Sequence, residues 1–146
     1  KAHSILKETH PDLRLLIYDG LRPRSIQWIL WNTLSDVPEK ERTNFVADPR
    51  TGSIHNFGAA VDLTVTHKNG TPLDMGTHYD YFGDLAFPRL EDSLIVVGDL
   101  TLEQVNNRLI LRDAMTQAGF SPITTEWWHF DSFPYKETKQ KFTIIE

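Results

Sequence analysis

Residues 53–66 read Ser-Ile-His-Asn-Phe-Gly-Ala-Ala-Val-Asp-Leu-Thr-Val-Thr, and the second half of this stretch predicts a β-strand. Between residues 59 and 66, β-branched and apolar residues alternate with others, which is typical of a strand with one face in the core. Val61 and Leu63 share the apolar face, whereas Asp62 points to the other side. A carboxylate inside such a strand is costly to bury unless it is paired or bound to a metal. Asp62 is therefore the first candidate functional residue.

Upstream of this stretch, the pattern predicts the tail of one helix, a strand and a second helix. The tail ends at residues 10–11 (His-Pro), and residues 13–18 (LRLLIY) form an apolar run of strand length that stops at residues 19–20 (Asp-Gly). Pro23 can open the second helix, because its missing N–H costs nothing in the first turn. The apolar stripe expected on that helix consists of Ile26, Trp28, Ile29, Leu30, Trp31 and Leu34.

Downstream, the sequence predicts loops and one well-delimited helix. Residues 35–52 and 68–100 are rich in charged, Gly or Pro residues, and both predict loops, the second one long and functional. Residues 101–104 (Thr-Leu-Glu-Gln) have the form of a capping box, and Gly119 is placed to end the helix that starts there. Its expected buried stripe consists of Leu102, Val105, Leu109, Ala114, Met115 and Ala118.

The order of the predicted elements indicates an α+β fold. Residues 126–130 and 142–145 are rich in aromatic or β-branched residues, which favours two more strands. Short strands mixed with a few helices are typical of the α+β class. The length of 146 residues suits a single domain with a core of its own.

Charge and residue counts exclude several classes of protein. Twenty Asp and Glu against fifteen Lys and Arg give a net charge of -5, the opposite of the basic surface that nucleic-acid binding requires. The absence of cysteine excludes disulfides, zinc fingers, iron–sulfur sites and thiol catalysis. No apolar run approaches the ~20 residues that span a bilayer. We therefore expect neither a nucleic-acid partner nor a membrane-spanning segment.

Two stretches together offer a ligand set for a metal ion. Residues 53–62 contain His55 and Asp62, and residues 126–129 (Glu-Trp-Trp-His) contain His129. Zinc accepts nitrogen and oxygen ligands, and a catalytic site uses three of them and leaves the fourth position to water. On one straight strand His55 and Asp62 would face opposite sides, so the chain must turn between them, which Gly58 permits. Taken singly, each of these residues is more often an ordinary core or surface residue.

The same motifs resemble a known family. The pattern Ser-x-His-x-x-Gly-x-Ala-x-Asp, followed downstream by Glu-x-x-His, resembles the zinc D-Ala-D-Ala peptidases, whose fold is related to that of the hedgehog signalling domain. Residues 18–23 (YDGLRP), 74–82 (DMGTHYDYF) and 126–130 (EWWHF) resemble its D-alanyl-D-alanine dipeptidase branch, which includes the vancomycin-resistance dipeptidase. The matches follow the family's order from about residue 15 to residue 130.

This resemblance implies a fold, a metal and a set of site residues. The fold is a small antiparallel sheet that carries the zinc site and packs with a few helices. The resemblance implies that one zinc ion per chain is bound by His55, Asp62 and His129, and that Glu126 is the general base and acid. The resemblance further implies that Arg22 polarises the scissile carbonyl and that Asp80 binds the substrate's ammonium group. It also implies that Ser53 lines the pocket and that Asp19 orients Arg22. Family members usually carry more chain before these motifs, so we expect residues 1–146 to be a zinc peptidase domain without part of that N-terminal segment.

The expected function is that of a bacterial zinc metallopeptidase that hydrolyses D-Ala-D-Ala or a close D,D-dipeptide. One alternative is a D,D-carboxypeptidase or endolysin that acts on longer peptidoglycan peptides. Asp80 argues against it, because a carboxylate that pairs with a free amino terminus favours dipeptides. The other alternative is a zinc-stabilised binding module without activity, which would need neither Glu126 nor Arg22. The second substrate residue, the oligomeric state and the compartment, cytoplasmic or periplasmic, stay open at this point.

Overall fold

A computed structural model describes residues 1–146 and places the Asp62 strand inside a four-stranded antiparallel sheet. The strands follow the spatial order β1 (Leu13–Asp19), β2 (Ala60–His67), β4 (His129–Asp131) and β3 (Ser121–Pro122). Since β2 has a neighbour on each side, nearly all of its residues are buried. The strands predicted at residues 13–18 and 59–66 are thereby confirmed.

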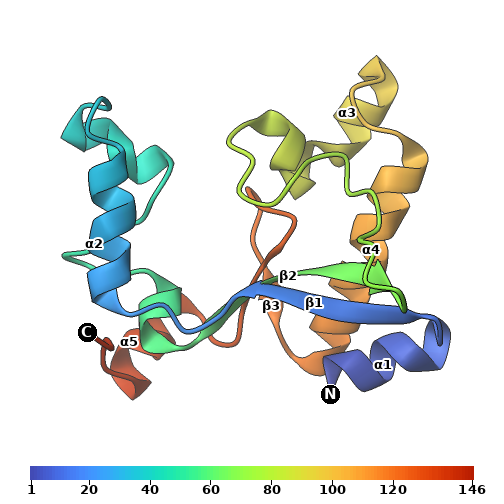
Figure 1. Ribbon diagram of the computed structural model, residues 1–146, viewed down its shortest axis with the longest axis horizontal. Coiled ribbons are helices and arrows are strands. Elements are labelled where there is room, and N and C mark those ends of the chain that lie inside the picture. The colour runs from blue at the N-terminus through green and yellow to red at the C-terminus, as the bar shows by residue number, and fades with distance from the viewer.

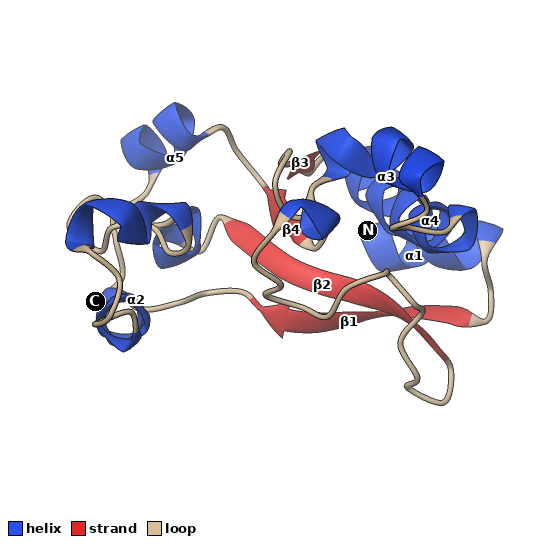
Figure 2. Cartoon of the chain, turned by 90° about the horizontal axis from the view of Figure 1, so that it is seen from above, coloured by secondary structure: helices blue, strands red, loops and turns tan.

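Five helices lie at the two ends of this sheet. They are α1 (Ala2–Thr9), α2 (Arg24–Thr33), α3 (Glu91–Val97), α4 (Leu102–Ala118) and α5 (Tyr135–Lys141), with four short 3₁₀ turns, η1 (Glu39–Asn44), η2 (Ile54–Phe57), η3 (Asp84–Ala86) and η4 (Pro88–Leu90). Figures 1 and 2 show α1, α3 and α4 together at one end and α2 and α5 at the other. None of these helices has the length and apolar composition needed to cross a bilayer. Helices and an antiparallel sheet in this mixed order confirm the α+β class.

The main core lies between the sheet and α4. Leu63 and Val65 of β2 meet Phe130 of β4 and Leu111 and Met115 of α4. Both ends of α4 lie where the sequence predicts them. At the start, the Thr101 hydroxyl accepts a hydrogen bond from the backbone N–H of Gln104 over 3.1 Å, and the Gln104 side chain accepts one from Thr101 in return. At its end, Gly119 adopts a left-handed φ of 104°.

The stripe predicted for α2 is wrong in most positions. Trp31 is buried as expected, but Ile26 and Ile29 are 44% and 58% exposed, and the other buried residue is Gln27. The reason is that α2 does not pack on the main core. Its inner face meets the loop before η2, where the Gln27 amide donates a hydrogen bond to the carbonyl of Ala47.

The stripe predicted for α4 is also only partly correct. Val105, Ala114 and Met115 are buried, whereas Leu102 and Leu109 are exposed. Arg108 and Leu111 are buried instead. The buried face of α4 therefore includes the charged side chain of Arg108, which donates hydrogen bonds to backbone carbonyls of a neighbouring segment.

Two further expectations are wrong at the level of secondary structure. The predicted loop 68–100 contains α3, and residues 142–145 form no strand. The polypeptide after α5 is instead held by single backbone hydrogen bonds: Ile145 donates to the carbonyl of Asn56, and Arg24 donates to the carbonyl of Ile145. These two hydrogen bonds hold the segment after α5 in place without making it a strand of the sheet.

Candidate functional site

Three neighbouring elements bring His55, Asp62 and His129 together, and all three residues are buried. His55 lies on η2, which the Ser53 side chain caps by accepting a hydrogen bond from the His55 backbone N–H. Gly58 then turns the chain into β2 with a left-handed φ of 66°. On the sheet, Asp62 of β2 is the direct partner of His129 of β4 in the antiparallel register. The turn at Gly58 and the pairing of β2 with β4 thus bring the three side chains together.

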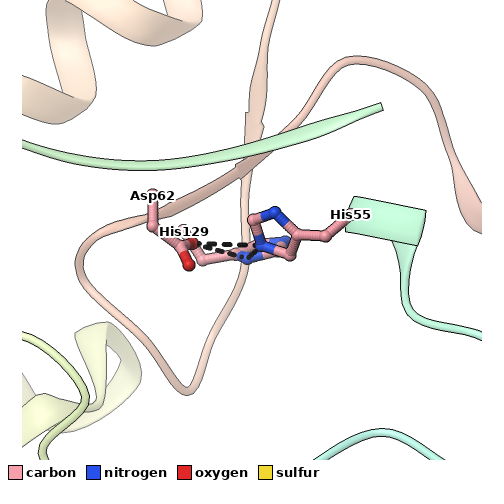
Figure 3. Close-up of side chains that lie close together, drawn as sticks. All are labelled: His55, Asp62 and His129. Carbon is pink, nitrogen blue, oxygen red and sulfur yellow. Dashed lines mark hydrogen bonds and ion pairs between the residues drawn. The ribbon is translucent and has the colours of Figure 1, made fainter. Parts of the chain in front are cut away.

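The facing atoms of these three side chains form a small triangle (Figure 3). Nε2 of His55 lies 3.1 Å from Nδ1 of His129. Oδ1 of Asp62 lies 3.0 Å from that Nδ1 and 3.3 Å from Nε2 of His55. In a tetrahedral site with ligands at about 2.0–2.2 Å from zinc, the donor atoms lie about 3.3–3.6 Å apart. The triangle is therefore close to the size that one zinc ion requires.

Hydrogen bonds on the outer side of both rings direct lone pairs into the triangle. Nδ1 of His55 donates to the carbonyl of Gly20 over 2.8 Å, and Nε2 of His129 donates to Oδ1 of Asp131 over 2.8 Å. A neutral imidazole carries a single N–H, so the facing nitrogens are then free to bind an ion. The other oxygen of Asp62 accepts a hydrogen bond from the Tyr79 hydroxyl over 3.2 Å.

The electrostatics of the triangle also favour a cation. Burial lowers the pKa of His129, but hydrogen bonds to Asp131 and Asp62 outweigh this effect and raise the pKa to about 10. Burial raises the pKa of Asp62, yet hydrogen bonds from His129 and His55 hold it well below its usual range. A positive charge between these groups, either a proton or a metal ion, is therefore stabilised. Donor set, spacing and charge all fit a divalent metal.

Glu126 lies at the rim of the triangle and is not one of its three members. Its carboxylate is 3.8 Å from Nδ1 of His129. Because β4 begins only at His129, Glu126 precedes the strand, and alternation along a strand does not turn its side chain away. Burial raises the pKa of Glu126, and the charges of Asp62 and Asp80 raise it further. A carboxylate with a raised pKa next to a metal position is suited to proton transfer.

Arg22 is held by a network of side chains. Its Nε and Nη2 atoms both donate to Oδ2 of Asp19, and its Nη1 atom donates to Oε1 of Gln27 over 3.0 Å. Its Nη2 atom also lies 3.8 Å from Oδ2 of Asp62. Since Asp19 and Gln27 occupy most of its donors, the guanidinium has a fixed direction before any ligand arrives.

One cavity of about 330 Å³ contains most of the predicted site residues. Those that line it are Arg22, Ser53, His55, Asp62, Asp80, Glu126 and His129. Asp19 does not line the cavity, but it accepts hydrogen bonds from Arg22, which does. The lining holds three carboxylates and one guanidinium, so its net negative charge suits a metal ion and a ligand ammonium group.

The structure adds three residues that the sequence pattern missed. Gln27 lies five positions after Arg22, on α2, and its contact with Arg22 depends on how the loop at residues 20–23 folds. Tyr79 reaches Asp62 across 17 positions of the chain, and no local pattern predicts this contact. Asp131 had a signal: it follows His129 by two positions, so both side chains leave the strand on the same face.

The fold and the site together define an α+β protein with a candidate mononuclear metal centre made of two imidazoles and one carboxylate. The model of the D-ala-D-ala dipeptidase family, peptidase M15, matches residues 2–144 of the chain. The chain therefore belongs to this family.

Relatives of known name support this assignment. The chain is similar to the D-alanyl-D-alanine dipeptidase of Escherichia coli (strain K12), with 36% identity over 119 residues that cover 82% of the chain and 55% of the relative. For the D-alanyl-D-alanine dipeptidase of Enterococcus faecium the identity is 30% over 129 residues, covering 80% and 60%. For that of Enterococcus faecalis (strain ATCC 700802 / V583) it is 28% over 145 residues, covering 89% and 68%. The chain thus spans between 55% and 68% of the length of these relatives.

Proposed function

We propose that residues 1–146 form a zinc peptidase domain that hydrolyses D-Ala-D-Ala or a close D,D-dipeptide. The observation that carries the proposal is the convergence of a metal-binding triangle, a free glutamate and a fixed arginine on one cavity. Family membership and the names of the relatives point to the same substrate class. In this proposal His55, Asp62 and His129 hold one zinc ion, which when bound supplies Lewis-acid activation of water and of the scissile carbonyl.

The chain's own groups carry the proton and the charges of the reaction. The Glu126 carboxylate takes a proton from the attacking water as the new C–O bond forms, and gives it to the departing amine as the C–N bond breaks. Arg22 donates hydrogen bonds to the carbonyl oxygen while negative charge develops on it. Because Asp19 and Gln27 already orient Arg22, little reorganisation is needed at that moment.

Asp80 and Ser53 provide substrate selection in this proposal. The Asp80 carboxylate accepts hydrogen bonds from the free ammonium group of the dipeptide, and Ser53 lines the same cavity. Burial, followed by the negative charge of Asp62, raises the pKa of Asp80. A positively charged ligand group relieves this repulsion, which favours a substrate with a free amino terminus.

A reconstitution experiment tests the function. The chain is treated with a chelator, supplied with zinc, and assayed on D-Ala-D-Ala, on its N-acetyl form and on a longer peptidoglycan peptide. Zinc-dependent hydrolysis of the free dipeptide, with little turnover of the other two, supports the proposal. Equal cleavage of the longer peptide would instead identify a carboxypeptidase or endolysin, and a gain of thermal stability without hydrolysis would identify a binding module.

A further inference from the structure

The segment that carries Asp80 has little regular structure of its own. Between Met75 and Gly83 no residue belongs to a helix or strand. Asp80 is the one residue other than glycine with a positive φ, 58°. Such a conformation is unfavourable for a residue with a side chain and persists only where the surroundings enforce it. The surroundings of residues 75–85, here called the Asp80 segment, must therefore determine where Asp80 lies.

One side chain from α4 holds both ends of the Asp80 segment. Arg108 is 1% exposed, and its Nε atom donates to the carbonyl of Met75 over 2.7 Å. Its Nη2 atom donates to the carbonyl of Leu85 over 2.8 Å. Figure 1 shows the yellow-green segment beside the orange helix α4. A single planar guanidinium thus joins two carbonyls that are ten residues apart along the chain.

The same guanidinium also packs against an aromatic side chain that contacts the Asp80 segment. It lies over the ring of Trp127, with 5.9 Å between Cζ and the ring centroid. The Trp127 indole N–H in turn donates to the Thr77 hydroxyl over 2.8 Å. Trp127 therefore contacts both Arg108 and Thr77 of the Asp80 segment, and it adds to the support of that segment.

We infer that Arg108 is a positioning residue that fixes the Asp80 segment, and through it the carboxylate that selects the substrate's ammonium group. The inference rests on the proposed function of Asp80. Arg108 touches neither the cavity nor the metal triangle, whose ligands come from η2, β2 and β4. Its loss should therefore impair recognition of the free amino terminus and leave metal binding unchanged.

The Arg108→Lys variant tests the inference with little change in charge. Lysine keeps the positive charge beside Glu91, which also pairs with Arg112, but one ammonium group cannot reproduce the planar fork that meets both carbonyls. We expect kcat/KM for D-Ala-D-Ala to fall about 10- to 100-fold, mainly through KM, as a misplaced binding group predicts. The much lower rate on N-acetyl-D-Ala-D-Ala and the zinc affinity should stay unchanged. Asp80→Ala in the Arg108→Lys background should add little further loss.

The matched control is Arg112→Lys, which also changes a partner of Glu91 but makes no contact with the Asp80 segment. It should retain the full preference for the free dipeptide. An equal loss in both variants, or an equal loss on both substrates, would overturn the inference.

A second measurement separates this inference from the proposed function. Chymotrypsin can cleave after Tyr79, Tyr81 and Phe82, and cleavage there should be faster in Arg108→Lys than in the wild type or in Arg112→Lys. If the wild type hydrolyses no dipeptide, the proposed function fails, while faster cleavage still supports the anchoring role of Arg108. Unchanged cleavage rules that role out. Should Arg108→Lys not fold, Arg108→Gln serves in the same assays.

Discussion

The Asp131 carboxylate accepts a hydrogen bond from Nε2 of His129 over 2.8 Å, from the same face of β4. Outer partners of this kind set the tautomer and direction of a ligating imidazole, and their removal typically weakens metal binding about 10- to 100-fold. We expect this loss of zinc affinity in Asp131→Ala, measured by competition with a chromophoric chelator. Asp131→Asn keeps an acceptor oxygen and should lose less. Equal zinc affinity in Asp131→Ala and the wild type would remove Asp131 from the site.

His129→Ala should release the metal. The substitution removes one of three ligands and leaves the Asp62 carboxylate without its cross-strand partner. The wild type should bind one zinc ion per chain, with ligand distances near 2.0–2.2 Å. Elemental analysis after gel filtration measures the occupancy, and His67→Ala, an exposed histidine on the same sheet, is the control. Full occupancy in His129→Ala would mean that a different residue is the ligand.

Arg22→Ala should reduce kcat far more than zinc affinity. The guanidinium is proposed to act on the carbonyl oxygen, and removal of one such donor typically costs about 10²–10³ in kcat. Steady-state kinetics with the zinc-loaded protein measure the effect, and Arg89→Ala, an exposed arginine outside the cavity, is the control. Near-normal turnover would show that Arg22 serves only the structure around Asp19.

Asp80 should set the preference for a free amino terminus. A hydrogen bond to a charged group contributes about 1.5–3 kcal/mol, which corresponds to about 10- to 100-fold in kcat/KM. The wild type should therefore prefer D-Ala-D-Ala over its N-acetyl form by about this factor. Asp80→Ala should erase most of the preference by impairing the free dipeptide alone. Equal rates on both substrates in the wild type would favour the carboxypeptidase alternative.

Substitution of Gly76 by alanine tests the packing at the start of the Asp80 segment. The φ of Gly76 is +80°, and a Cβ at this position would clash with Cδ2 of Leu100. Gly70 has a similar φ of +87° but open space around it. Gly70→Ala should cost about 1–2 kcal/mol of unfolding free energy from the backbone conformation alone. Gly76→Ala should cost roughly 1–3 kcal/mol more because of overpacking. Urea unfolding measures both, and equal costs would contradict the packing shown here.

Much of the fold follows from local sequence. Alternation between residues 59 and 66 predicts β2, and the capping pair Thr101 and Gln104 with Gly119 predicts both ends of α4. These signals are reliable because each depends on hydrogen bonds and side-chain directions within a few positions of the chain. The candidate metal ligands were predicted from two short motifs, residues 53–62 around Gly58 and residues 126–129, whereas the roles of Arg22 and Asp80 came from the family resemblance.

Burial and support were decided only by the tertiary structure. His55 and His129 meet across 74 positions of the chain, and Arg108 reaches the carbonyl of Met75 across 33. No periodicity reports such contacts, so the exposed Ile29 and the buried Gln27 of α2 contradicted the predicted stripe. The sequence by itself thus determined which residues are present that could bind a metal and, to within one residue, where β1, β2 and α4 begin and end. The tertiary structure decided which faces are buried and which distant groups, such as Tyr79 and Arg108, hold the site residues in place, because those interactions arise only when remote segments pack together.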